Sequence, residues 1–285
     1  MGVRWLVTGG GGMLAADVLD RVGRSGDPVL APDRAELDLL DEPAVRDLVG
    51  AYRPEVVVNC AAWTAVDEAE SREEEALAVN GRAVGVLAEA CSWAGARLVH
   101  LSTDYVFDGR SRVPYREDDQ PAPVNAYGRT KLAGELAAAG HYVVRTAWLY
   151  GAHGPNFVRT MIRLAAERET VDVVNDQRGQ PTWTVDLAGL LVRLATSDLP
   201  PGVYHGTSSG QTTWYGLARE IFTLLGADPA RVRPVTSADF PRPAQRPANS
   251  VLATTRGEPI RHWRAALHAA WPVLHREEER QCSPA

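Results

Sequence analysis

The first 24 residues predict a strand, a glycine-rich turn and a helix, in that order. The apolar run Val3–Thr8 ends in four consecutive glycines, Gly9–Gly12, and a helical pattern then continues to about Arg24. In such a unit small residues let the backbone approach a pyrophosphate, and the helix N-terminus offers unpaired N–H groups. The alternative is a plain tight turn, but the position between strand and helix favours a dinucleotide site. This beginning restricts the chain to α/β folds with a parallel sheet.

Apolar runs typical of buried strands alternate with helical patterns as far as residue 150. The further strands are predicted at Pro28–Ala31, Glu55–Asn59, Ala96–Leu101 and His141–Thr146. Beyond residue 150 the alternation loosens, with helices expected at 156–169, 184–195 and 214–225 and a strand at 170–174. The fold class predicted is α/β, a Rossmann-type doubly wound parallel sheet with a smaller, mixed α/β substrate-binding domain. The Rossmann domain would comprise 1–149 and 170–200, the smaller domain 150–169 and 201–275, and a charged, disordered tail 276–285.

An acid and an arginine stand side by side after the second strand, as Asp33 and Arg34. An acid at this place binds the ribose 2′-hydroxyl of a dinucleotide, whereas an arginine receives a 2′-phosphate. Because both are present, these residues leave the choice between NADH and NADPH open.

Lys131 is the only lysine, because the other 29 of the 30 basic side chains are arginine. It lies four residues after Tyr127, so on a helix the two share a face. An ammonium at this distance stabilises phenolate over phenol and is expected to lower the pKa of the tyrosine, which suits a general acid. The alternative is a surface tyrosine and a solvated lysine that merely share a helix. The use of lysine at this single place favours a catalytic role for the pair.

Two polar segments are candidates for contacts with a substrate. Ser102, Thr103 and Asp104 end the fourth strand, and parallel sheets bind ligands at the carboxyl ends of their strands. These hydroxyls could instead only cap a turn. The second segment, 242–250, contains two arginines among prolines and could grip a diphosphate or form an exposed loop.

Composition excludes several classes of protein. A net charge of −6 without a basic stripe argues against a nucleic-acid binder, and no run approaches the roughly 18 apolar residues of a membrane span. The first strand begins too early for a signal peptide, and three scattered cysteines suggest neither a disulfide framework nor a zinc site. The acidic run 68–75 is interpreted as a solvated face. We therefore expect a cytoplasmic protein with no nucleic-acid or membrane partner.

Five segments together resemble the dTDP-4-dehydrorhamnose reductase family of the extended short-chain dehydrogenase/reductase superfamily. The resemblance covers about Val3–Leu274, and its most specific pieces are 58–67, 102–109, 127–135, 175–182 and 246–250. It implies NAD(P)H-dependent reduction of the C4 ketone of a dTDP-4-keto-6-deoxy-L-hexose, with NADPH as cofactor and NADH as the alternative.

The resemblance also implies roles for individual residues. Tyr127 would donate a proton to the incipient alkoxide, Lys131 would lower its pKa and bind the nicotinamide ribose, and Thr103 would hold the carbonyl oxygen. The dinucleotide would be lined by Gly9, Gly12, Met13, Leu14, Arg34, Asp38, Leu39, Ala61, Ala62 and Trp63, together with Tyr127 and Lys131. The nucleotide-sugar would be faced by Thr103, Asp104, Trp148, Gln177, Pro181, Thr182, Arg246 and Asn249.

The chain departs from the family pattern in places. Ala15 replaces the third glycine of the turn, and Trp183 stands where a smaller residue is expected and would reshape the sugar pocket. Some members dimerise through Mg²⁺ held by acids that include one near the C-terminus. No matching acid precedes the tail, so we predict no metal and either a monomer or a homodimer.

Two rival functions share this fold. One is a non-catalytic subunit that binds a cofactor or a sugar nucleotide, but such a subunit has no need of Thr103, Tyr127 and Lys131 together. The other is an epimerase or a 4,6-dehydratase. Dehydratases follow the threonine with two acids, whereas here Tyr105 takes the second place, so dehydration is not expected.

Overall fold

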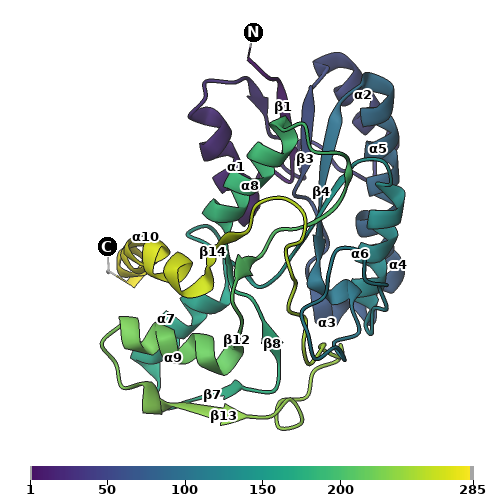
Figure 1. The fold of residues 1–285 in the computed structure, drawn as a ribbon. Helices are drawn as coiled ribbons and strands as arrows, with labels where there is room; N and C mark the ends of the chain where they lie inside the picture. Colours follow the sequence, from purple (N-terminus) through teal and green to yellow (C-terminus); the bar gives the residue numbers. More distant parts are fainter. Residues whose placement is uncertain (1, 283–285) are drawn as a thin grey trace.

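The computed structural model describes residues 2–282 and has two lobes (Figure 1). The larger lobe is built on a sheet of six strands, all paired in parallel, in the order β10-β5-β4-β3-β1-β2. Its strands are β1 (Trp5–Thr8), β2 (Val29–Leu30), β3 (Val56–Asn59), β4 (Arg97–Thr103), β5 (Tyr142–Thr146) and β10 (Gly202–His205). The chain runs outward from β1 to β2 and then returns to β3 on the other side. This reversal between β1 and β3 is the switch point at which open parallel sheets bind ligands.

Helices cover both faces of this sheet because alternate strand residues point to opposite sides. Trp5 and Val7 pack with helices α1 and α8, whereas Leu6 packs with α2 and α5 on the other face. Helix α6 lies beside α5 (Figure 1). These helices are α1 (Met13–Gly23), α2 (Glu42–Tyr52), α5 (Ala83–Ala94), α6 (Ala126–Ala137) and α8 (Thr184–Thr196). Between β3 and α5 lie α3 (Val66–Ala69), α4 (Glu73–Leu77) and a π-helical segment, Ala78–Arg82, and after β4 comes the 3₁₀ turn Asp104–Val106. The predicted doubly wound fold is confirmed.

The smaller lobe has its own apolar core. Helices α7, α9 and α10 pack around the parallel pair β7–β13, and Tyr150, Phe222 and Leu267 are fully buried among them. The elements are α7 (Phe157–Glu167), β7 (Val171–Val174), α9 (Trp214–Leu224), the 3₁₀ turn Pro229–Arg231, β13 (Val232–Val235) and α10 (Trp263–Cys282). Three short pairs join the lobes: β6 (Leu149–Tyr150) with β9 (Thr182–Trp183), β8 (Arg178–Gly179) with β12 (Thr212–Thr213), and β11 (Ser208–Ser209) with β14 (Ile260–His262).

The lobes divide the chain differently from the sequence prediction in two places. Strand β10 pairs with β5 and completes the large sheet, although 201–275 was assigned to the smaller domain. Strand β7 pairs with β13 in the smaller lobe, although 170–200 was assigned to the Rossmann domain. Both differences arise because each of these strands pairs with a segment far away in the sequence, and local patterns do not identify such a partner.

The predicted disordered tail, 276–285, overlaps the last helix. The backbone of α10 is helical to Cys282, since the run of arginine and glutamate after His275 has high helix propensity. Residues 283–285 lie outside the described residues. No helix between residues 2 and 282 is long and apolar enough to cross a membrane.

Candidate active site

The glycine turn after β1 is shaped for close backbone approach. Gly9 has a φ of +71°, and a Cβ there would lie 2.8 Å from the backbone nitrogen of Ala61, so only glycine fits. Gly12 precedes α1 and provides no side chain to cap it. The N–H groups and the positive dipole end of an 11-residue helix therefore remain available to an anion such as a dinucleotide pyrophosphate.

A groove of about 460 Å³ extends from this turn across the switch point. Seven of the predicted cofactor residues line it, namely Gly9, Gly12, Arg34, Asp38, Leu39, Ala61 and Ala62. The side chain of Leu14 is buried in the core between α1 and the sheet, so only its backbone could face a phosphate. Met13 lies at the first position of α1, with its sulfur 3.8 Å from Nδ2 of Asn156. The groove and its glycine cradle fit an extended dinucleotide.

Asp33 and Arg34 differ in how freely they can meet a ligand. The carboxylate of Asp33 accepts from the backbone N–H of Ala35 at 2.8 Å and of Glu36 at 3.0 Å, so it stabilises its own turn. Arg34 is exposed at the groove, and no described residue forms a hydrogen bond or ion pair with it. The cation, rather than the acid, is free to bind the ribose substituent.

Trp63 is held by a residue that sequence analysis did not select. The buried side chain of Asn80 accepts from the backbone N–H of Trp63 at 2.9 Å and donates to its carbonyl at 3.1 Å and to Thr130 on α6. Asn80 lies in the π-helical segment, a distortion often found at functional sites. It ties the loop after β3 to the helix that carries Tyr127. A lone Asn in the apolar run 76–90 was the signal in the sequence.

Helix α6 places Tyr127 and Lys131 beside the end of β4. The carbonyl oxygen of Asn125's side chain caps the helix by accepting from the N–H of Gly128 at 2.7 Å. A Cβ on Gly128 would come within 2.2 Å of the carbonyl oxygen of Tyr105, so glycine permits this close packing. Lys131 is 2% exposed, and its ammonium donates to the carbonyl of Leu101 at 2.6 Å. Burial lowers the pKa of Lys131 to about 8, against the opposing effect of Glu135.

The predicted effect of Lys131 on Tyr127 is wrong in this structure. Burial raises the pKa of Tyr127 to about 12, and the charge of Asp104 adds to the increase, while a hydrogen bond with the Thr103 hydroxyl opposes it. The ammonium of Lys131 is directed to the backbone of β4 instead. Tyr127 is therefore a neutral phenol at pH 7, which is the form that can donate a proton.

Asp104 is a buried carboxyl at the centre of the site. It accepts from the Thr103 hydroxyl at 3.0 Å, and the hydroxyl of Ser250 also donates to it. Its side chain is 2% exposed, and this burial raises its pKa to about 7. The two hydroxyls thus connect the end of β4 with the segment 242–250 of the distant part of the chain.

One of the two arginines that could grip a diphosphate already has a protein partner. Arg246 makes a two-pronged ion pair with Asp67, with one N–O distance of 3.0 Å, and hydrogen-bonds Tyr105. Asp67 lies 179 residues earlier in the chain, in the short helix α3. The hydrogen bond holds the pKa of Asp67 below its usual value, so the carboxylate is ionised. A diphosphate would have to share Arg246 with this acid.

Trp148 is presented by an unusual backbone conformation and an aromatic stack. Its φ is +47°, which costs a bulky residue free energy and is typical of functional positions. Its indole stacks on that of Trp214 with centroids 3.6 Å apart and 9° between the planes, and a Cβ on Gly179 would meet it at 2.5 Å. Trp214, the first residue of α9, was not predicted as a site residue. The sequence around Trp214 does not indicate this role, because Trp148 and Trp214 meet only in the folded chain.

The remaining predicted substrate residues are engaged within the protein. Thr182 is fully buried, and its hydroxyl accepts from the N–H of Ser208 at 3.2 Å. Asn249 donates to the carbonyl of Ser111 at 2.8 Å, and Gln177 donates to Ser237 at 2.9 Å. Pro181 is also buried. These residues shape the wall between the lobes, and backbone contacts of 178 with 248–250 connect them to Asp104.

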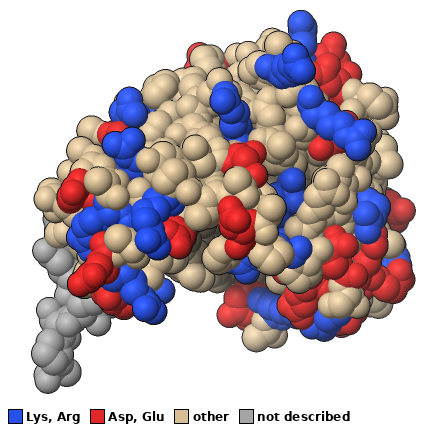
Figure 2. Space-filling view, turned by 90° about the horizontal axis from the view of Figure 1, so that it is seen from below, with Lys and Arg blue, Asp and Glu red and all other residues tan. Residues whose placement is uncertain are grey.

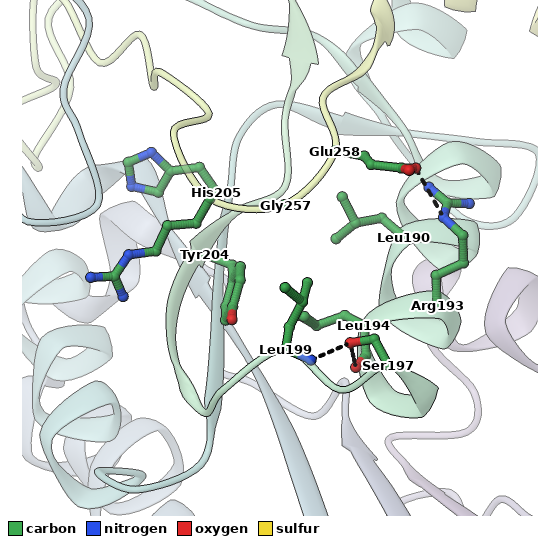
Figure 3. A pocket seen from close by; sticks show the side chains of 10 residues that line it. Leu190, Arg193, Leu194, Ser197, Leu199, Tyr204, His205, Gly257 and Glu258 are labelled. Atoms are coloured by element: carbon green, nitrogen blue, oxygen red, sulfur yellow. Dashed lines mark hydrogen bonds and ion pairs between the residues drawn. The ribbon is translucent and has the colours of Figure 1, made fainter.

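A second cavity, of about 380 Å³, lies between α8, the end of β10 and residues 256–258 (Figure 3). Its walls are mainly Leu190, Leu194, Leu199 and Tyr204. The imidazole of His205 points away from Leu190 and Arg193 in Figure 3 and contacts the carbonyl of Ala253. This cavity contains none of the predicted site residues.

Charged side chains of both signs occur over the described part of the chain. No group of His, Cys, Asp or Glu among the described residues could hold a metal ion, and the prediction of no metal stays a prediction. On the face shown in Figure 2, arginines and acids are interspersed.

Comparison with known proteins adds to this geometry. The chain matches the family model described as the RmlD substrate binding domain over residues 3–275. A dTDP-4-dehydrorhamnose reductase of Streptomyces griseus is 55% identical over 95% of this chain and 94% of the relative. A dTDP-4-keto-6-deoxy-D-glucose reductase of Streptomyces niveus is 52% identical over 96% of this chain and 99% of the relative. The crystal structure of dTDP-4-dehydrorhamnose reductase from Bacillus anthracis in complex with NADP has a TM-score of 0.92 at 34% identity, covering 95% of this chain and 99% of that one.

Proposed function

The chain belongs to the dTDP-4-dehydrorhamnose reductase family, and from this membership we propose that it reduces the C4 ketone of a dTDP-4-keto-6-deoxy-L-hexose. The observation that carries the proposal is the contact of the Thr103 hydroxyl with the Tyr127 phenol beside the buried Lys131. These groups lie at the carboxyl end of β4, at the same edge of the parallel sheet as the glycine cradle after β1. A binding subunit would not need a proton donor there.

The residues of the chain divide the chemistry among them. Thr103 and Tyr127 hold the carbonyl oxygen, and the phenol gives up its proton as the oxygen becomes an alkoxide. Lys131 would hold the reacting end of a bound cofactor through its ammonium. A bound nicotinamide cofactor supplies the hydride. Trp148 forms one wall for the sugar.

We propose NADPH as the preferred cofactor, with NADH as the alternative. Arg34 is exposed and unpaired among the described residues, whereas Asp33 is committed to its own turn. A 2′-phosphate would therefore meet an unpaired cation. The carboxylate that would bind a 2′-hydroxyl is already used by its own turn. The relative from Bacillus anthracis was crystallised with NADP, in agreement with this choice.

The test follows the absorbance of NADPH, and then of NADH, with enzymatically prepared dTDP-4-keto-L-rhamnose, and identifies the product by NMR. We expect rapid oxidation of NADPH. Tyr127→Phe should lose turnover yet bind NADPH with nearly unchanged affinity, because only the proton donor is removed. Binding of both ligands by the wild-type protein without oxidation of either cofactor would overturn the proposal and favour a binding subunit.

A further inference from the structure

A buried ion pair joins α6, the helix that carries Tyr127 and Lys131, to strand β5. Arg145 of β5 donates to both carboxylate oxygens of Glu135 on α6, at 2.9 and 2.7 Å. The two side chains are 3% and 5% exposed. The hydroxyl of Ser102 donates to the same carboxylate at 2.5 Å. Glu135 is thus held by strands β4 and β5 at once.

The cluster of Ser102, Glu135 and Arg145 lies beside the part of β4 that contacts Lys131 and Tyr127. Ser102 pairs in register with Arg145, and its neighbours in β4 are Leu101, which accepts from Lys131, and Thr103, which contacts Tyr127. Glu135 lies one helical turn beyond Lys131 on α6, so both side chains share a face. Fixing Glu135 therefore fixes the position of α6 relative to the end of β4.

Glu135 is also the negative charge that acts on Lys131. The other titratable groups that interact with the ammonium are Cys60 after β3 and His100 on β4, and Tyr127 lies one turn earlier on α6. Burial raises the pKa of Cys60 to about 12 and that of Tyr127 to about 12, and it holds the pKa of His100 well below its usual value. All three are neutral at pH 7. Of the side chains that offset the desolvation of the ammonium, Glu135 has the larger effect and Cys60 the smaller, and the carbonyl of Leu101 also accepts from it.

We propose that Glu135 is a positioning residue for the reduction, clamped by Ser102 and Arg145 so that it orients α6 and keeps the buried Lys131 protonated at working pH. The inference rests on the role proposed above for Lys131. It gives the glutamate at the end of the segment 127–135 an electrostatic task in addition to its structural one.

The single lysine allows a direct test. Protein grown with carbon-13-labelled lysine has one Cε resonance, and its change with pH reports the pKa of Lys131 alone. We expect a midpoint near pH 8 in the wild-type protein. Glu135→Gln should lower the midpoint by about one unit, since it removes a nearby opposite charge. The alkaline limb of kcat/KM for the keto-sugar should move to lower pH with it.

Glu135→Gln leaves Arg145 buried without a counter-ion, which can prevent folding. The double variant Glu135→Gln/Arg145→Met removes that unpaired charge, and it should show the same direction of shift. Glu135→Asp keeps the charge and should restore most of the wild-type midpoint. Glu73→Gln is the matched control, because Glu73 of α4 pairs at 2.7 Å with Arg129, which lies on the exposed side of α6. It should leave the midpoint unchanged.

An unchanged Lys131 midpoint in a folded Glu135 variant would overturn the electrostatic role. A lowered midpoint with an unchanged rate profile would overturn its link to the reaction. If Lys131→Met retained turnover, the proposed role of Lys131 itself would fail, whatever the Glu135 variants show. A joint shift of midpoint and rate profile supports the proposal.

Discussion

Replacing Trp214 with leucine tests whether the stacked indole pair contributes to substrate binding. Trp214 holds Trp148 at 3.6 Å between ring centroids, and Trp148 has a φ of +47°. A well-stacked aromatic pair contributes about 0.5–1.5 kcal/mol beyond its buried area. The backbone of Trp148 costs about 1–3 kcal/mol to hold in this conformation, so loss of its support should let the indole move away. If that free energy is used in binding, KM should rise about two- to thirteen-fold.

The assay measures KM for the keto-sugar at saturating NADPH, and KM for NADPH at saturating keto-sugar. Only the first should rise in Trp214→Leu, because neither Trp148 nor Trp214 lines the groove for the dinucleotide. Trp214→Phe should retain part of the stack and give a smaller increase. Trp93→Leu is the control, since Trp93 is 82% exposed on α5. An unchanged KM for the keto-sugar in folded Trp214→Leu would refute the reasoning.

Three further substitutions probe the cofactor groove and the catalytic centre. Lys131→Arg should lose turnover in the NADPH assay, because a planar guanidinium cannot replace a compact buried ammonium; full activity would remove the argument from the single lysine. Arg34→Ala should raise KM for NADPH about ten-fold and leave KM for NADH unchanged, since one charge-assisted contact is lost; equal effects on both cofactors would contradict the assignment. Asp104 binds more protons in the folded than in the unfolded state between about pH 4 and pH 7, so its contribution to stability is largest at the acid end and falls as the pH rises to 7. Asp104→Asn should remove that slope from the free energy of unfolding measured in urea, and parallel curves for the two proteins would argue against a raised pKa.

Most strands could be predicted from sequence because buried parallel strands are continuous apolar runs. Val56–Asn59 and Tyr142–Thr146 lie within one residue of their expected bounds. Strand β10 was missed because it begins with Gly202 after two prolines and has only four residues. Nothing local identifies such a segment as a strand, since its place is decided by pairing with β5.

The candidate site was predictable where a motif has a fixed local geometry. The helix carrying Tyr127 and Lys131 and the glycine cradle at Gly9 are of this kind. The direction of the pKa shift of Tyr127 was not predictable, because burial depends on the packing of distant segments. The partner of Arg246 was likewise hidden, since Asp67 is 179 residues away in sequence. Sequence identifies the chemical groups, and tertiary packing decides their ionisation and their partners.

The position of β10 also determines when the protein can complete its fold during synthesis. The edge of β5 is covered by β10 at residues 202–205. One face of the sheet is covered in part by α8 at 184–196, which is made after β5. A nascent chain that ends at β5 therefore presents unpaired backbone groups and bare apolar side chains, which are templates for association with other chains. The first half of the polypeptide depends on segments from its last third to become closed, so translation must run well past the catalytic residues before they are protected.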